Sequence, residues 1–78
     1  MKPLTPKFLF HYEELLIEIF EDGMVLVNYK NDHSYNEWLI KKTIISAEQR
    51  GRFIWISTDD HTELGLDCKM HILFIHQL

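Results

Sequence analysis

The chain of 78 residues has a single cysteine, Cys68, so no disulfide can form within it. Small domains from oxidising compartments usually depend on such bridges. Long apolar runs are also missing: Met24–Val27 and Ile72–Ile75 are far shorter than the roughly 20 residues that span a bilayer. The N-terminus lacks the apolar segment of a secretory signal. We therefore expect a cytoplasmic protein that does not enter the membrane.

Glycine is scarce as well, and its three residues are isolated from one another, which excludes a glycine-rich phosphate-binding loop. The histidines His61, His71 and His76 follow no established zinc spacing with Cys68. In an extended segment Cys68 and His71, three residues apart, point to opposite faces. Burial of Cys68 on an apolar face would disfavour its reactive thiolate. We expect no metal site, no cofactor and no enzymatic activity.

What the sequence does contain is apolar surface for one small domain. Aliphatic and aromatic residues make up 46% of the chain, which is enough for a hydrophobic core and too much for a disordered segment. At this length we expect one domain over residues 1–78. Both prolines lie within residues 1–6, which show no periodicity and should form an irregular arm.

Two β-type segments, residues 15–20 and 24–29, are joined by a turn that contains Asp22-Gly23. An Asp-Gly pair between such segments is the strongest short-range signal for a β-hairpin, because glycine accepts a positive φ. Residues 7–14 fit either a short helix, capped by Thr5, or an extension of the first strand. Both interpretations stay open.

The segment that follows the first hairpin carries signals for both a helix and a strand. Ser34 and Glu37 form a capping-box pattern, whereas the β-branched residues after Trp38 favour a strand. We expect one short helical turn at most. Beyond it we expect a strand, a turn and a second strand over about residues 39–46, 47–51 and 52–58. The last of these places its aromatic residues on one face and its isoleucines on the other.

In the last segment every second residue from Leu64 to Phe74 is apolar, as in a strand with one buried face. Strands usually have about 5–6 residues, so this longer run should be bent or broken, and Gly65 is the expected place. The expected buried face consists of Leu64, Leu66, Cys68, Met70, Ile72 and Phe74.

All the connections between these segments are short. They leave no room for a crossover helix, so the strands should pair antiparallel. Long bent strands joined by short hairpins are typical of small barrels. The sequence therefore predicts a mainly β fold: a small antiparallel barrel or strongly curved sheet of five to six strands, with at most one short N-terminal helix.

Acidic residues outnumber basic ones and give a formal net charge of −4. Several of them gather around the first hairpin without a basic neighbour. Such a surface can orient a basic partner by electrostatic attraction, although acidic runs are often only solvated surface. We favour a non-enzymatic regulator that binds a protein with a basic surface. The expected partner-binding residues are Glu13, Glu14, Glu18, Glu21, Asp22 and Asp67.

A basic and aromatic stretch in the middle of the chain leaves a second hypothesis open, a small barrel that binds nucleic acid. Aromatic rings beside arginines can stack on bases, although such rings more often belong to a core, and this is the interpretation we favour. A third hypothesis is a structural module that self-associates into a homo-oligomer through a strand edge. The residues of the alternative nucleic-acid surface are Lys41, Lys42, Arg50, Arg52, Phe53 and Trp55.

Two stretches resemble the Rof family of small bacterial proteins that inhibit the Rho termination factor. Residues 11–23 are similar to the entry of that family into its first hairpin, and residues 62–67 are similar to its "ELRLD" strand. The resemblance implies an Sm-like barrel whose acidic surface occupies a basic RNA-binding surface on Rho, and so a role in transcription antitermination. The acidic residues in matching positions are Glu13, Glu14 and Asp67.

Overall fold

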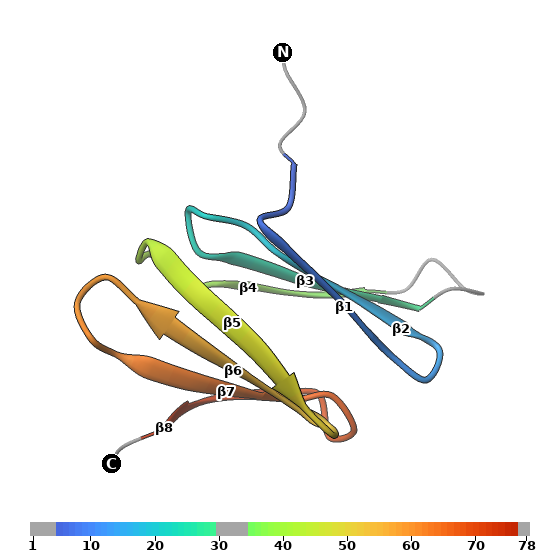
Figure 1. The fold of residues 1–78 in the computed structure, drawn as a ribbon. Coiled ribbons are helices and arrows are strands. Elements are labelled where there is room, and N and C mark those ends of the chain that lie inside the picture. The colour runs from blue at the N-terminus through green and yellow to red at the C-terminus, as the bar shows by residue number, and fades with distance from the viewer. Residues whose placement is uncertain (1–4, 30–34, 77–78) are drawn as a thin grey trace.

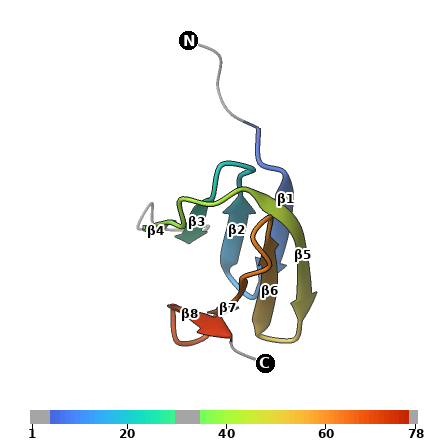
Figure 2. The same ribbon diagram turned by 90° about the vertical axis from the view of Figure 1, so that its left-hand side faces the viewer.

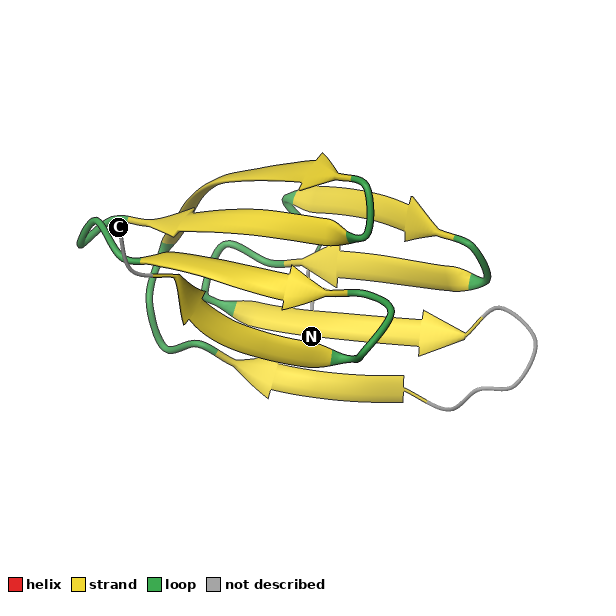
Figure 3. Cartoon of the chain, turned by 90° about the horizontal axis from the view of Figure 1, so that it is seen from below, coloured by secondary structure: helices red, strands yellow, loops and turns green. Residues whose placement is uncertain are grey.

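The computed structural model describes residues 5–29 and 35–76, and over these residues the chain forms strands and turns but no helix (Figure 3). The strands of this part are β1 (Phe8–Tyr12), β2 (Leu15–Ile19), β3 (Met24–Tyr29), β4 (Tyr35–Leu39), β5 (Ile44–Arg50), β6 (Phe53–Thr58), β7 (Glu63–Asp67) and β8 (Ile72–His76). They form two four-stranded sheets, in the orders β1-β2-β3-β4 and β5-β6-β7-β8. Every pairing is antiparallel, as predicted.

The predicted hairpin is confirmed, since β2 pairs with β3 in a register that places Ile17 opposite Val27. Gly23 in its turn has a φ of 100°, which glycine adopts at little cost. The turn also lies against the connection between β4 and β5. A Cβ atom at position 23 would stand 2.7 Å from the carbonyl oxygen of Lys42, so both the backbone angle and this close approach require glycine.

The hydrophobic core lies between the two sheets, which Figures 1 and 2 show as separate layers. Alternating positions of the strands point into it, because successive side chains of a strand face opposite sides of the sheet. Ile17 and Ile19 of the first sheet and Ile54 and Ile56 of the second are fully buried. The buried cluster consists of Leu15, Ile17, Ile19, Val25, Val27, Ile44, Ile54, Ile56, Leu64, Leu66 and Cys68.

The prediction of a barrel or curved sheet of five to six strands is wrong in its details, although the mainly β class is confirmed. The described residues contain eight strands, and no backbone ladder joins the two sheets. Side chains of β5 and of Lys7, the residue before β1, connect the neighbouring edges of the two sheets instead. The amide nitrogen of Gln49 donates to the His11 carbonyl oxygen at 2.8 Å, and Lys7 Nζ donates to the Ile44 carbonyl oxygen at 3.0 Å.

Two local expectations are decided by the structure. Of the two interpretations left open for residues 7–14, the extended one holds: they form β1 and its turn, because their alternating residues pair with β2 and place Phe8 and Phe10 against the core. The strand expected over 39–46 and the turn at 47–51 are shifted. Residues 35–39 are extended as β4, the chain crosses between sheets at 40–43, and β5 continues to Arg50. The strand expected over 52–58 is confirmed as β6.

The long alternating segment breaks at residues 68–71 rather than at Gly65. The Asp67 carboxylate accepts hydrogen bonds from the backbone N–H groups of Lys69 and Met70 at 3.0 and 3.1 Å, which stabilises a turn there. The turn places Leu73 opposite Leu66 in the ladder. After the turn, residues 73 and 75 therefore point inward and residues 72, 74 and 76 point outward, the reverse of the prediction. Leu64, Leu66 and Cys68 are buried as expected.

The same exchange of parity corrects the second half of the expected buried face. Met70 lies in the turn and is 58% exposed, and Ile72 is 49% exposed. Phe74 pairs with Gly65 on the outer face of the sheet and is half-buried there. Leu73 takes its place against the core.

Candidate binding surfaces

Four ring-bearing side chains gather on the outer face of the β5–β8 sheet, on the side away from the core. Phe53 and Trp55 come from β6, and Phe74 and His76 from β8. We call these four residues the aromatic face. The rings of Phe53 and Trp55 are stacked, with centroids 5.6 Å apart and an interplanar angle of 22°. Phe74 meets both edge-on, and the His76 ring centroid lies 4.9 Å from that of Trp55.

Gly65 of β7 makes this arrangement possible, because it lies between Trp55 and Phe74 in the strand register. Without a side chain, it leaves room for the rings of β6 and β8 to meet above the central strand. A Cβ atom at position 65 would stand 2.8 Å from Trp55 Cζ3. The glycine is needed here for space rather than for its backbone angle.

The expectation that Phe53 and Trp55 belong to the core is therefore wrong. Both are half-buried, and neither is among the residues packed against the core. The sequence had predicted that aromatics and isoleucines occupy opposite faces of this strand, and that part is confirmed. Ile54 and Ile56 take the inward face, so the aromatic residues must point outward.

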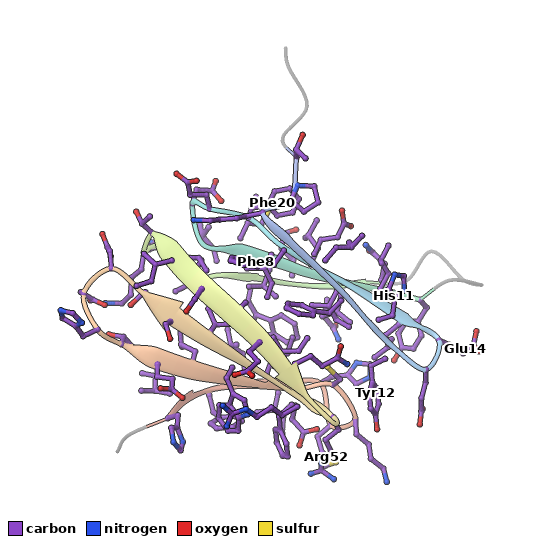
Figure 4. All side chains as sticks on the ribbon, viewed as in Figure 1. Phe8, His11, Tyr12, Glu14, Phe20 and Arg52 are labelled. Carbon is purple, nitrogen blue, oxygen red and sulfur yellow. The ribbon has the colours of Figure 1, made fainter. Side chains whose placement is uncertain are left out.

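Arg52 lies in the turn between β5 and β6 (Figure 4) and borders the aromatic face at Phe53. Its Cζ atom lies 4.9 Å from the centroid of the Phe53 ring, within the range of a cation–π contact. Its Nη2 donates to Asp67 Oδ2 at 2.8 Å. Partial burial alone would raise the pKa of the Asp67 carboxyl, but hydrogen bonds from the Met70 N–H, Arg52 and the Lys69 N–H hold that pKa below its usual value.

The basic residues of the alternative nucleic-acid surface do not form one patch. Arg50 and Arg52 flank the turn after β5, whereas Lys41 and Lys42 precede that strand at its opposite end. Each arginine also has a carboxylate partner, since Arg50 Nη2 lies 2.9 Å from Glu48 Oε2 and Arg52 is paired with Asp67. Lys42 is paired with Asp60.

The six acidic residues predicted to bind a partner are also divided by the fold. Glu13 and Glu14 form the turn before β2, whereas Glu21 and Asp22 lie in the turn after it. These turns are separated by the length of β2, about 3.3 Å for each residue. Glu18 lies between them and accepts a hydrogen bond from Asn28 Nδ2 at 3.0 Å.

The sixth residue, Asp67, belongs to the other sheet. It is 6% exposed and paired with Arg52. Its carboxylate is therefore occupied in holding a turn and an arginine. Two adjacent acidic pairs stay exposed, Glu21 and Asp22 at one end of β2 and Glu13 and Glu14 at the other. The latter pair, Glu13 and Glu14, lies beside the β7–β8 turn.

This pair borders a cavity of about 420 Å³ at one end of the two sheets. Tyr12 and Glu14, which Figure 4 labels at the β1–β2 turn, line it from one side. Cys68, Lys69 and His71 line it from the β7–β8 turn. The backbone N–H of Cys68 donates to the Arg52 carbonyl oxygen at 2.8 Å. The β1–β2, β5–β6 and β7–β8 turns therefore share one end of the molecule.

A polar network stabilises the wall of this cavity. Asn36 Nδ2 lies 3.0 Å from His71 Nδ1, and the hydroxyl of Tyr29 lies 2.9 Å from His71 Nε2. If the asparagine amide donates to Nδ1, the other ring nitrogen carries the hydrogen and donates to the tyrosine. His71 has a φ of 57°, so its backbone conformation is one that residues other than glycine adopt uncommonly.

Of the four residues named for a zinc site, Cys68 and His71 line the same cavity, but each is engaged in other interactions. Cys68 is buried, and its thiol pKa is raised to about 11 by burial and by the nearby Asp67 carboxylate. His71 is bonded to Tyr29 and Asn36, and His76 packs on Trp55. Among the residues that the structure describes, no group of three or more His, Cys, Asp and Glu side chains could hold a metal ion.

Comparison with known proteins adds no relative. No family model, no curated protein and no solved structure matches the chain. Over residues 5–29 and 35–76, the structure contains no helix of the length and apolarity needed to cross a membrane.

Proposed function

We propose that this chain is a non-enzymatic protein-binding domain and that the aromatic face is its main contact with the partner. The observation that carries the proposal is the position of Phe53, Trp55 and Phe74. These large rings lie outside the core and retain partial exposure on an open sheet surface. Tryptophan and arginine are enriched among the residues that dominate the energy of protein interfaces.

The packing of the rings on one another supports a role in binding. Trp55 is held between Phe53, Phe74 and His76, so its ring is fixed before a partner arrives. A side chain that is already ordered loses less conformational entropy on binding. Arg52, which the Asp67 carboxylate holds beside Phe53, extends this ordered surface by a charged group.

The charges favour a protein over nucleic acid as the partner. Stacked rings such as Phe53 and Trp55 could also accept bases, and this keeps nucleic acid as the second candidate. Affinity for nucleic acid, however, comes largely from cations that neutralise phosphates. The two arginines beside the rings are paired with carboxylates, and the chain carries a net charge of −4.

The Rof resemblance adds a candidate for the partner, namely Rho or another nucleic-acid-binding protein with a basic surface. Net charge of −4 fits such a partner. Glu13 and Glu14 lie at the same end of the molecule as Arg52, where they could steer a basic surface toward the aromatic face. In this proposal the acidic pair increases the association rate, and the aromatic rings supply most of the affinity.

The test compares Trp55→Ala with Leu9→Ala, a control on the outer face of the other sheet. Leu9 is 53% exposed, so both substitutions remove outward-facing apolar atoms. Tagged proteins would be used to capture partners from a bacterial lysate, and purified Rho would be titrated separately. We expect the leucine variant to retain the captured protein and the tryptophan variant to lose at least about tenfold in affinity, as for a binding hot spot.

Two further measurements separate the alternatives. Fluorescence anisotropy with single-stranded RNA and DNA should show no binding that depends on Trp55. Binding to those oligonucleotides that Trp55→Ala abolishes would instead establish the nucleic-acid hypothesis. Changing Glu13 and Glu14 together to glutamine should slow association with the protein partner at low salt and have little effect at high salt, where charges are screened.

A further inference from the structure

The cavity of about 420 Å³ at one end of the molecule has walls from both sheets. The first sheet contributes Tyr12, Leu15 and Tyr29, which are neighbours across three strands because Tyr12 pairs with Leu15 and Leu15 with Tyr29. The second sheet contributes Cys68 and His71 from the β7–β8 turn. Leu15 and Cys68 are buried, so the side of the cavity toward the core is apolar.

Aromatic rings form the other walls of this cavity. Tyr29 and His71 stack with ring centroids 5.5 Å apart and an interplanar angle of 27°, and the Tyr29 hydroxyl lies 2.9 Å from His71 Nε2. Tyr12 packs against the core from β1. All three residues are half-buried, so packing orders their rings while they still line the cavity.

Charged groups line the exposed side of the cavity. Glu13 and Glu14 come from the β1–β2 turn and Lys69 from the β7–β8 turn, and all three are exposed. Two carboxylates therefore stand against one ammonium group. Glu13 has a φ of 51°, which glycine or asparagine adopts at a lower cost. The conformation of the turn therefore does not require glutamate at this position.

We propose that this cavity binds an organic cation, an ammonium group with alkyl substituents. The faces of aromatic rings attract such cations, and quaternary ammonium groups are recognised by cages of several rings. The two carboxylates add to this attraction, and the apolar base accepts the alkyl groups. A hard metal ion would need a shell of oxygen ligands and would leave the apolar base empty. The volume of about 420 Å³ lies within the roughly 300–1,000 Å³ of small-molecule sites.

A second hollow, at the opposite end of β2, provides a comparison within the same chain. It has a volume of about 310 Å³, and Glu21 and Asp22 line it. The ring that lines it, Phe20, is 7% exposed, so this hollow has acidic groups without accessible aromatic faces. Acidity alone would attract a cation to both places, whereas an alkylated cation should prefer the cavity beside Tyr12.

The test titrates choline into the unmodified chain and follows the backbone amides by NMR spectroscopy. Choline should shift the amides of the β1–β2 and β7–β8 turns until the shifts saturate. Its uncharged isostere, in which carbon replaces the nitrogen, should bind at least about tenfold more weakly. The titration involves neither Trp55 nor a protein partner, so this proposal and the proposed function can each fail while the other holds.

Variants identify the groups that recognise the charge. Tyr12→Leu should weaken choline binding at least about tenfold, whereas Tyr12→Phe, which keeps the ring, should retain it. Glu13→Asn should weaken binding about threefold and leave the urea midpoint unchanged or raised, because asparagine tolerates a positive φ. The matched control, Glu21→Asn, should leave the affinity unchanged.

A peptide that contains trimethyllysine distinguishes the two sources of such a group. Tighter binding of the peptide than of choline assigns the cation to a protein side chain, and tighter binding of choline assigns it to a free small molecule. Both results support a cation site. The proposal is overturned if neither probe gives saturable shifts, or if the isostere binds as well as choline. It is also overturned if the shifts lie at residues 20–23 and Glu21→Asn removes them.

Discussion

Phe74 and Gly65 face each other across the β7–β8 ladder, and the phenylalanine ring occupies the space where a side chain at position 65 would stand. The ring of Trp55 approaches the same position from β6. One glycine in a central strand therefore allows three neighbouring strands to build a continuous aromatic surface. The relationship can be tested directly, because alanine at position 65 adds only one methyl group.

Gly65→Ala should displace the rings of Trp55 and Phe74 and lower the free energy of unfolding by about 1–3 kcal/mol, the usual effect of overpacking. Urea unfolding gives the stability, and near-ultraviolet circular dichroism reports the ring packing. The same substitution in a Phe74→Ala background should be less destabilising, because the ring that clashes is gone. Equal losses in both backgrounds would show that Phe74 does not limit the space at position 65.

Ile56→Ala and Ile72→Ala remove the same atoms from opposite faces of the second sheet. Ile56 is fully buried and Ile72 is 49% exposed. We expect the first substitution to cost about 2–5 kcal/mol and the second to remain within about 0.5 kcal/mol. Urea midpoints of the two variants distinguish the faces. A larger loss of stability for Ile72→Ala would show that Ile72 points inward and that the register assigned to β8 is wrong.

The Asp67 carboxyl should make stability depend on acid pH. Its pKa in the folded chain is below the ordinary value of 3.8, so the folded state favours the ionised form. This contribution is fully present above that ordinary value and is lost as pH falls through the lower folded pKa. The difference in unfolding free energy between the unmodified chain and Asp67→Asn should be constant near neutral pH and shrink in acid. If the difference in unfolding free energy grew on acidification instead, the pKa of Asp67 would be raised in the folded chain rather than lowered.

Cys68 should resist alkylation while the chain is folded. It is 2% exposed, and its thiol pKa of about 11 leaves little of the reactive thiolate at neutral pH. Iodoacetamide labelling followed by mass spectrometry should be slow in buffer and fast in urea. The labelling rate of a free cysteine derivative under both conditions provides the control, and equally rapid labelling of the folded chain would mean that Cys68 is accessible.

Several features followed from local patterns and are confirmed by the structure. The Asp22-Gly23 turn predicted the hairpin of β2 and β3, because the positive φ that such a turn needs is a local property of glycine. The alternation of residues 52–58 predicted that Ile54 and Ile56 share a face opposite Phe53 and Trp55. The candidate site is only partly predicted by the sequence: Arg52, Phe53 and Trp55 are grouped in one hypothetical surface, whereas Phe74 is assigned to the buried face and His76 to no surface. Phe74 and His76 are two residues apart and so share a face of β8. The sequence would place that face outward only if the turn at residues 68–71, which exchanges the two faces, were known.

The sequence by itself determined a mainly β chain with antiparallel hairpins and the division of each strand into two faces, since a period of two is a local property of extended backbone. It determined only in part which face of each strand points inward: Leu64, Leu66 and Cys68 are buried as predicted, whereas Ile72 is not. That depends on the length of each turn, and the turn at residues 68–71 exchanges the two faces of the last segment. Only the tertiary structure decided that the aromatic residues lie outside the core, that Glu13 and Glu14 are separated from Glu21 and Asp22, and that Asp67 pairs with Arg52. These relationships join residues from different strands, and the packing of two sheets fixes them rather than any pattern along the chain.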